Sequence, residues 1–132
     1  MTWTTAIKKI MIDAAFPSTQ KVALFLTAAG LDPDTRVTYS VTNETSGTGY
    51  TAGGLAITTR VSKTESTKAV ASHADLDYGV VTIDFQYGEW YDTVASNRSV
   101  AVVDYGAQSI SGVNLTFTVP AYTAATGLAR IA

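Results

Sequence analysis

Hydrophobic and polar residues alternate along much of this chain with the two-residue period of a β-strand. In residues 80–87 (VVTIDFQY), Val81, Ile83 and Phe85 alternate with polar neighbours, so one face is apolar and the other polar. Residues 114–119 (NLTFTV) repeat the pattern. Both segments therefore predict strands that are buried on one face.

Three other segments predict strands with a different environment. Residues 21–27 (KVALFLT) and 99–105 (SVAVVDY) are apolar on both faces, which is typical of central strands covered on two sides. Residues 55–61 (LAITTRV) place Leu55, Ile57 and Val61 on one face. The abundance of Thr, Val and Tyr favours pleated strands over helices.

Turn signals separate these segments: AAGLDPDT, TSGTG, GG, DYGV, YGE and YGAQSISG. Short strands at such spacing predict a mainly β fold, either an antiparallel β-sandwich or a small barrel. No linker, low-complexity tract or internal repeat divides the sequence. We therefore expect one compact domain, with a β-sandwich over residues 21–132 and an N-terminal helix or arm over residues 1–20.

The N-terminal segment has a different period. Over residues 4–16 (TTAIKKIMIDAAF) the apolar residues gather near one side and the lysines face away: Ile7, Ile10 and Met11 against Lys8 and Lys9. Thr4 or Thr5 could cap a helix here, and Pro17 would help to end it. The segment predicts a short helix, with a strand-like arm as the alternative.

Composition narrows the classes of function. The chain of 132 residues has 46% hydrophobic and 15% charged residues, which is ordinary for one globular domain, and it contains no apolar run long enough to span a membrane. The absence of cysteine excludes disulfides, zinc–thiolate sites and thiol nucleophiles. A net charge of −2 argues against a nucleic-acid-binding protein. The lysines near the N-terminus interrupt any secretory signal, so we expect this segment to belong to the mature fold.

Charge is unevenly spread along the chain. Residues 1–68 hold seven bases and five acids, whereas residues 69–132 hold two bases and six acids, and there is no Lys or Arg between Ala69 and Asn97. The first interpretation is a solvated acidic surface. The second is an interface that meets a basic partner or another copy of the chain.

A glycine-rich stretch, residues 43–58 (NETSGTGYTAGGLAIT), is the most distinctive part of the sequence. A phosphate-binding Walker loop would end in Gly-Lys-Ser/Thr, but Leu55 follows Gly54, and the spacing does not match a dinucleotide loop. Glycines permit turns with positive φ and close backbone approach. We therefore interpret the stretch as architecture.

Few residues suggest catalysis or metal binding. His73, with Asp75 and Asp77 at alternate positions, could ligate a divalent cation, although a solvated loop is the favoured interpretation. The acids Asp84, Glu89 and Asp92 could be considered as a carboxylate pair for glycoside cleavage. However, we expect Asp84 on an outward strand face and the other two in a turn, and no nucleophile elbow occurs. The sequence thus predicts neither enzymatic activity nor a cofactor.

Four aromatic residues gather within positions 78–91: Tyr78, Tyr87, Trp90 and Tyr91. Such residues could form a platform on which sugars stack, but core or interface packing is commoner. The sequons at Asn43, Asn97 and Asn114 are interpreted as chance matches.

The order of segments resembles a family of small structural proteins of tailed bacteriophages. A strand like KVALFLT leads through a variable loop ending in Asn-Glu to SGTGYTAGG and an apolar strand, then to AVVDYG, NLTFTVP and a final segment like GLARIA. The chain follows this order from about Lys21 to Ala132. It departs from the family in the mid-chain strand, where Tyr78 and acid-bearing VVTIDFQY replace a tryptophan and a basic residue.

The resemblance implies a non-enzymatic virion protein that is made in the cytoplasm of the host bacterium. The leading expectation is a decoration or cement protein on the outer face of the capsid, with the major capsid protein and copies of itself as partners, for instance as a trimer. A tail, head–tail or fibre component is the first alternative, and a host-glycan-binding module the second. No nucleic-acid or membrane partner is expected. The predicted contact residues are Trp3, Phe16, Gly49, Tyr50, Gly53, Gly54, Trp90 and Tyr91.

Overall fold

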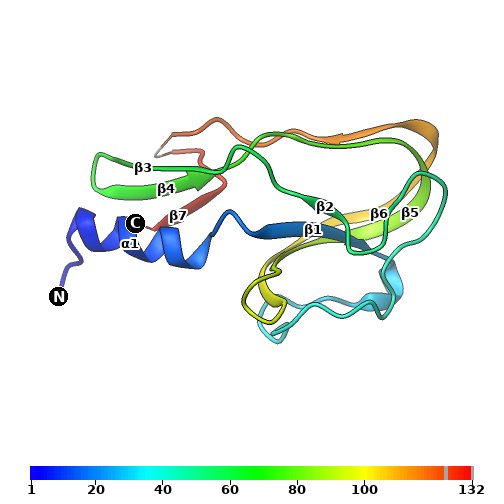
Figure 1. The fold of residues 1–132 in the computed structure, drawn as a ribbon, viewed down its shortest axis with the longest axis horizontal. Coiled ribbons are helices and arrows are strands. Elements are labelled where there is room, and N and C mark those ends of the chain that lie inside the picture. The colour runs from blue at the N-terminus through cyan, green and yellow to red at the C-terminus, as the bar shows by residue number, and fades with distance from the viewer. Residues whose placement is uncertain (124, 132) are drawn as a thin grey trace. The chain divides into compact units, whose positions relative to one another are not determined.

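The computed structural model describes residues 1–123 and 125–131 and shows a mainly β protein with two antiparallel sheets and one short N-terminal helix (Figure 1). This confirms the predicted fold class. The architecture is consistent with a small β-sandwich, and no closed barrel forms among the described strands. The elements are α1 (Thr5–Ala15), β1 (Gln20–Phe25), the 3-10 helix η1 (Thr27–Ala29), β2 (Leu55–Ala56), β3 (Val61–Glu65), β4 (Lys68–Ser72), β5 (Leu76–Asp92), β6 (Arg98–Phe117) and β7 (Ala129–Ile131).

The chain groups into two compact units, each assembled from segments that are distant in sequence. Unit 1 comprises residues 1–18, 57–75 and the described part of 118–132, and unit 2 comprises residues 19–56 and 76–117. Residues 1–18 thus group with a hairpin and with the C-terminal segment. The predicted arrangement as one compact domain stays a prediction.

Unit 2 is built on a four-stranded antiparallel sheet in the order β2-β1-β5-β6. β1 is central, as predicted, and five of its six residues are buried. Leu24 packs into a cluster with Val81, Ile83 and Phe85 of β5 and Leu115 of β6. Ala23 and Phe25 pack with Tyr91 in a second cluster. The apolar pattern on both faces of β1 therefore corresponds to two clusters.

β5 and β6 form a long hairpin whose glycines lie inside the strands (Figure 1). The predicted turns at DYGV, YGE and YGAQSISG are wrong, because these residues lie within β5 or β6. At DYGV, and within YGAQSISG, the ladder between the two strands shifts register instead. Residues 99–105 are also not a central strand, since β6 is an edge of the sheet and is half-buried or exposed over that stretch.

The strand predicted over residues 55–61 is wrong in its middle. β2 ends at Ala56 and β3 begins at Val61, and Thr59 between them has φ +51°. β3 pairs with β4, and β4 pairs with β7, in the three-stranded antiparallel sheet of unit 1. β7 lies in the GLARIA segment, whose last residue, Ala132, is outside the described residues.

The predicted N-terminal helix is confirmed as α1, which packs against the sheet of unit 1. The Thr4 side chain accepts a hydrogen bond from the backbone N–H of Ile7 at 3.4 Å and so caps the helix. Phe16 donates its backbone N–H to the carbonyl oxygen of Ile12 and ends it before Pro17. Lys8, Ile12 and Phe16 are buried on the side of the helix that faces the sheet.

Candidate interaction surface

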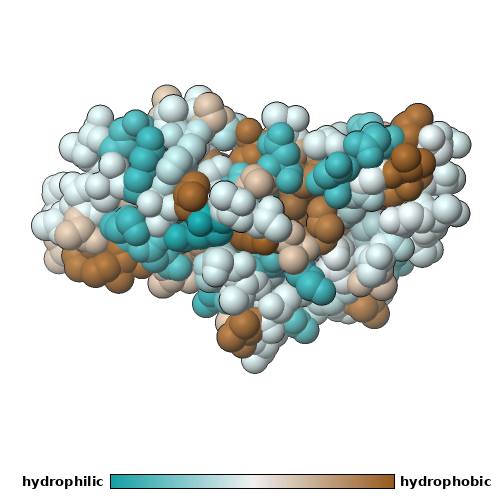
Figure 2. All heavy atoms as spheres, turned by 45° about the horizontal axis from the view of Figure 1, so that its top comes forward, coloured by the Kyte–Doolittle hydropathy of each residue, from teal (hydrophilic) through white to brown (hydrophobic). Residues whose placement is uncertain are grey.

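Helix α1 and the residues just before it carry an apolar surface that the fold leaves uncovered. Its large side chains keep 52% (Trp3), 39% (Ile7), 63% (Ile10) and 38% (Met11) of their accessible surface. Ala6 and Ala14 are exposed beside them. We call these six residues the outer face of α1. Figure 2 shows hydrophobic surface gathered at the lower left of the view, towards the region of α1 in Figure 1.

The polar residues of α1 are directed to its own sheet instead. Lys8 is only 6% exposed, and its Nζ donates to the carbonyl oxygen of Thr67 at 2.8 Å, in the turn between β3 and β4. A buried ammonium group is stable only when its donors are satisfied, so this bond helps to hold the helix in one orientation. The sequence pattern separated two sides of the helix but gave no sign of which one would face the sheet.

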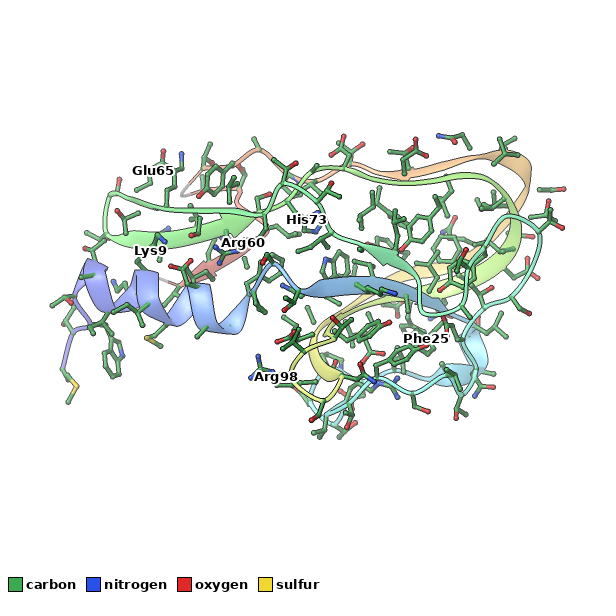
Figure 3. The ribbon with its side chains drawn as sticks, in the orientation of Figure 1. Lys9, Phe25, Arg60, Glu65, His73 and Arg98 are labelled. Atoms are coloured by element: carbon green, nitrogen blue, oxygen red, sulfur yellow. The ribbon has the colours of Figure 1, made fainter. Side chains whose placement is uncertain are left out.

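Asp13 joins the same side of α1 to Arg60, just before β3, and to Ser62 in β3, and it also pairs with Lys9 of α1 itself. Its carboxylate accepts from Lys9 at 2.5 Å, from Arg60 at 2.9 Å and from Ser62 at 2.5 Å. The hydrogen bond from Lys9, followed by that from Ser62, holds the pKa of Asp13 well below its usual range. Figure 3 shows Arg60 directed at α1, where its Nε also donates to the carbonyl oxygen of Phe16 at 2.8 Å.

Helix α1 departs in part from the usual arrangement on a soluble helix, because it buries Lys8 beside Ile12 and leaves Ile10 exposed. Helices normally bury their apolar stripe and expose their charges. A contiguous exposed apolar patch on a folded chain marks a site of association with protein or membrane. The outer face of α1 is therefore the strongest candidate for an interaction surface in the described part of the chain.

The glycine-rich stretch is held down inside unit 2 by Glu44, a residue that the sequence gave no reason to single out. Its Oε1 accepts from the Tyr50 hydroxyl and from the Gly53 N–H, both at 2.7 Å, and its Oε2 accepts from the Tyr39 hydroxyl at 2.6 Å. The Tyr50 hydroxyl accepts in turn from the Leu24 N–H at 2.9 Å. One carboxylate thus connects the stretch to β1 and to the preceding loop.

Close backbone contacts explain the glycines themselves. A Cβ placed on Gly54, where φ is +77°, would lie 1.9 Å from the carbonyl oxygen of Val22 in β1. A Cβ on Gly49, where φ is +84°, would lie 2.2 Å from the carbonyl oxygen of Val80 in β5. Neither position has room for a side chain. The stretch lies flat against strands of its own chain, as the architectural interpretation requires.

The predicted contact residues have different surroundings. Trp3 is exposed, whereas Phe16, Trp90 and Tyr91 are each only 4% exposed. Phe16 stacks on His73, with ring centroids 6.2 Å apart, and the Tyr91 hydroxyl donates to the Gly53 carbonyl oxygen at 2.7 Å. In this conformation a partner can reach Trp3 directly, but not the three buried rings.

The acidic residues considered for glycoside cleavage each have a separate role. Glu89 is fully buried and accepts two bonds from Arg36, at 3.0 and 2.8 Å. Asp92 accepts from Thr19 at 2.6 Å, and the exposed Asp84 accepts from Ser109 at 2.6 Å. With a rise of about 3.4 Å per residue, five residues of β5 separate Asp84 from Glu89 by roughly 17 Å, well beyond the ~9.5 Å of a catalytic pair.

His73 and its acidic neighbours form no cluster of metal ligands in the part of the chain that the structure describes. Among the described residues, no group of three His, Cys, Asp or Glu side chains could hold a metal ion. The favoured interpretation of a solvated loop is wrong at His73, which is only 5% exposed. Its Nδ1 lies 2.6 Å from the carbonyl oxygen of Ala74. Burial lowers the pKa of its imidazole. Asp75 accepts from the backbone N–H of Val119 at 2.8 Å and so connects two distant segments of unit 1.

Surface hollows offer no convergent chemistry. The hollow of about 500 Å³ in unit 2 is lined by Leu26, Thr27, Ala28, Asp84, Phe85, Ala107, Gln108 and Ser109. Its single carboxylate, Asp84, is already bonded to Ser109. The hollow of about 370 Å³ beside His73 in unit 1 is likewise open, and Asp75 is the one carboxylate among its lining residues. Across residues 1–123 and 125–131, no helix has the length and apolar content needed to cross a membrane.

Comparisons with protein-family models, with curated proteins and with solved structures found no match for this chain.

Proposed function

We propose that this chain is a non-enzymatic structural protein of a tailed-bacteriophage virion, and specifically a decoration or cement protein on the outer face of the capsid. The observation that carries the proposal is the outer face of α1. Leaving Ile10 and Trp3 exposed forgoes part of the roughly 1.5–3 kcal/mol that full burial of a large apolar side chain contributes, so covering both in an assembly is favourable. An uncovered apolar helix face indicates a subunit of an assembly. The order of sequence blocks around SGTGYTAGG indicates which kind of assembly.

A second surface suits contact with a capsid shell. Over its middle, one face of the β5–β6 hairpin carries hydroxyl, amide and carboxylate groups, from Thr82, Asp84, Gln86, Asp104, Ser109 and Ser111. Gln86 donates to Asp104 at 3.1 Å, and Ser109 donates to Asp84 at 2.6 Å, so the face is fixed by its own bonds. No lysine or arginine occurs in residues 69–97 or 99–129. This polar face of β5–β6 matches a basic patch on a partner.

The tail or fibre alternative uses the same surfaces in fewer copies, so the structure favours neither location. The host-glycan alternative has less support. Sugar binding through Trp90 and Tyr91 needs exposed rings, and both are only 4% exposed. A glycan array tests it, because specific binding that is lost on Trp90→Phe would favour that alternative over a structural role.

The experiment that tests the proposal is a count of copies per particle. Heads and tails are separated from the purified phage that encodes this chain, and quantitative mass spectrometry uses the major capsid protein as internal standard. Hundreds of copies in the head fraction are expected for a decoration protein, because it occupies every equivalent position on a symmetric shell. A handful in the tail fraction would transfer the assignment to the tail. Absence from both fractions would overturn the virion proposal.

A further inference from the structure

We propose that a second copy of this chain covers the outer face of α1, and that the two α1 helices pack antiparallel about a twofold axis. The inference rests on the proposed function in one respect, namely that the outer face is occupied within an assembly. The proposed function does not specify which molecule covers this face or how the two pack.

The spacing of the exposed residues is that of a helix–helix seam. The exposed Trp3 lies just before the N-cap, Thr4, and so precedes the helix. Within α1, Ile7, Ile10 and Ala14 follow one another at intervals of three and four residues. These are the intervals between a and d positions of a coiled coil. Ile12, which is 3% exposed, falls on the opposite side of the helix, against the sheet. The seam is thus directed squarely away from unit 1's own core.

The sizes of the seam residues favour the antiparallel direction. Two antiparallel copies centred between Ile7 and Ile10 place Ile7 opposite the Ile10 of the other chain. They also bring the segment just before the N-cap, which holds the large Trp3, to the end of the other helix that holds the small Ala14. Large residues facing small ones fill space without strain. A parallel pair would instead set Trp3 against Trp3 and Ala14 against Ala14, which crowds one end and leaves a gap at the other.

Charge on α1 favours a second copy over a lipid surface. Interfacial membrane helices carry free Lys and Arg on their polar face to meet anionic headgroups. Here Lys8 is buried on Thr67, and Lys9 is paired with Asp13 at 2.5 Å. The seam itself is uncharged, so two identical seams meet without repulsion. A charged peptide would find no counter-charge on it.

The contact is small, and this predicts its strength. A standard stable interface uses about 20–30 residues a side, whereas an 11-residue helix offers far fewer. The pair should therefore dissociate on dilution and persist where copies are held close together. Linked or crowded copies gain from a high effective concentration.

Sedimentation equilibrium of the full chain, up to about 1 mM, tests the proposal. We expect a monomer–dimer equilibrium that Ile10→Glu weakens at least tenfold. Val41→Glu is the matched control, because Val41 is equally exposed at 67% but lies outside α1, and it should leave the equilibrium unchanged. Thermal unfolding of each variant checks that the fold is intact.

Trp3 supplies an independent signal. It is 52% exposed and Trp90 is 4% exposed, so its fluorescence should shift to the blue as the concentration rises and the seam is covered. The shift should vanish in Trp3→Phe and in Ile10→Glu.

Engineered cysteines test the direction of the pair, because the chain has none of its own. Thr2→Cys and Ala14→Cys variants are oxidised separately and as a mixture in which one is mass-tagged. An antiparallel pair gives mixed disulfides mainly in the mixture. A parallel pair joins like positions within each separate variant, which would overturn the proposed geometry.

The inference itself is overturned if the wild type stays monomeric throughout, if it forms trimers, or if Ile10→Glu self-associates like wild type. A Trp3 shift that appears only with lipid vesicles would also overturn it. The particle count is separate: dimers from a chain that is absent from virions would refute the virion role and leave the pairing established.

Discussion

Close contact between the glycine-rich stretch and β1 makes Gly54 irreplaceable. Gly54→Ala should lower the free energy of unfolding by about 3 kcal/mol or more, because it adds a backbone clash to the cost of a left-handed conformation. Gly30→Ala is the control: φ there is +53°, and no described atom lies within 4 Å of the added Cβ, so the cost should be about 1 kcal/mol. Urea denaturation of both variants measures the difference, and equal losses would contradict the close-contact explanation.

His73 should make stability depend on pH near neutrality. Burial lowers the pKa of its imidazole in the folded state, so the unfolded chain binds more protons below the ordinary value of about 6.5. The stability contributed by the neutral imidazole is present above that pH and is lost as the pH falls. We expect wild type to lose stability from pH ~7.5 to ~5.5, with a slope of at most about 1.4 kcal/mol per unit.

The control for this pH dependence is His73→Phe, which retains an aromatic ring against Phe16 without a titrating group. Its stability profile should be flatter over the same range. Parallel profiles for variant and wild type would show that another group is responsible.

Single residues differ in how far the sequence could predict their roles. Four glycines within eight positions indicated turns and close approach, because few other structures need so many. The role of Glu44 could not be predicted from the sequence, because loops and not a periodic pattern bring its partners Tyr39, Tyr50 and Gly53 to it. Glu89 and Asp92 were expected in a turn, yet both lie within β5.

The orientation of α1 can be tested with two isoleucines on the same helix. Ile12→Ala should cost about 2–4 kcal/mol of unfolding free energy, because Ile12 is 3% exposed and its removal leaves a cavity. Ile10→Ala should cost well under 1 kcal/mol in dilute solution, because Ile10 is 63% exposed. Chemical denaturation at a concentration below self-association gives both values. The reverse order would mean that the helix faces the other way.

Strand boundaries were less predictable than strand existence. Gly79, Gly106 and Gly112 were interpreted as turns between short strands, but each lies within a long strand. A bulge and a turn use the same residue because both need positive φ, so local sequence alone cannot separate them. The shifts of register at 105–107 and at Gly112 also interrupt the open edge of β6 and so guard it against uncontrolled pairing.

Buried tyrosines should determine the highest pH at which the chain stays folded. Burial is the leading cause that raises the pKa of Tyr50, Tyr78, Tyr39 and Tyr91, and it raises that of Tyr105 to about 12. Their folded pKa values exceed the unfolded value of about 10, so this contribution is complete below pH ~10 and is lost as the pH rises further.

Between pH ~10 and ~12 we therefore expect tyrosinate absorbance to appear together with loss of circular dichroism, in one cooperative step. Tyr105→Phe should remove part of the absorbance change. Gradual ionisation while the circular dichroism stays constant would show that these hydroxyls are accessible in the folded state.

The division into two units could not be predicted from sequence. Each unit joins distant segments, and their contacts come from pairings such as Ala69 with Ile131. The alternation of apolar and polar residues gives information only about residues that are close in sequence. Val70 and Ala71 were not assigned to a strand, because KAVAS is short and lacks alternation, although β4 is buried at four of its five residues.

The order in which the two units close their chains has a consequence for synthesis. On the ribosome, the helix at the start of the chain emerges first, but β7, which completes its sheet, emerges after everything else in the described chain. Unit 2 has all its strands once residue 117 is free. Unit 2 should therefore fold before unit 1 during synthesis. Until β7 has been made, α1 is left without its complete sheet, and its apolar residues are exposed to chaperones or to a neighbouring nascent chain on the same messenger RNA.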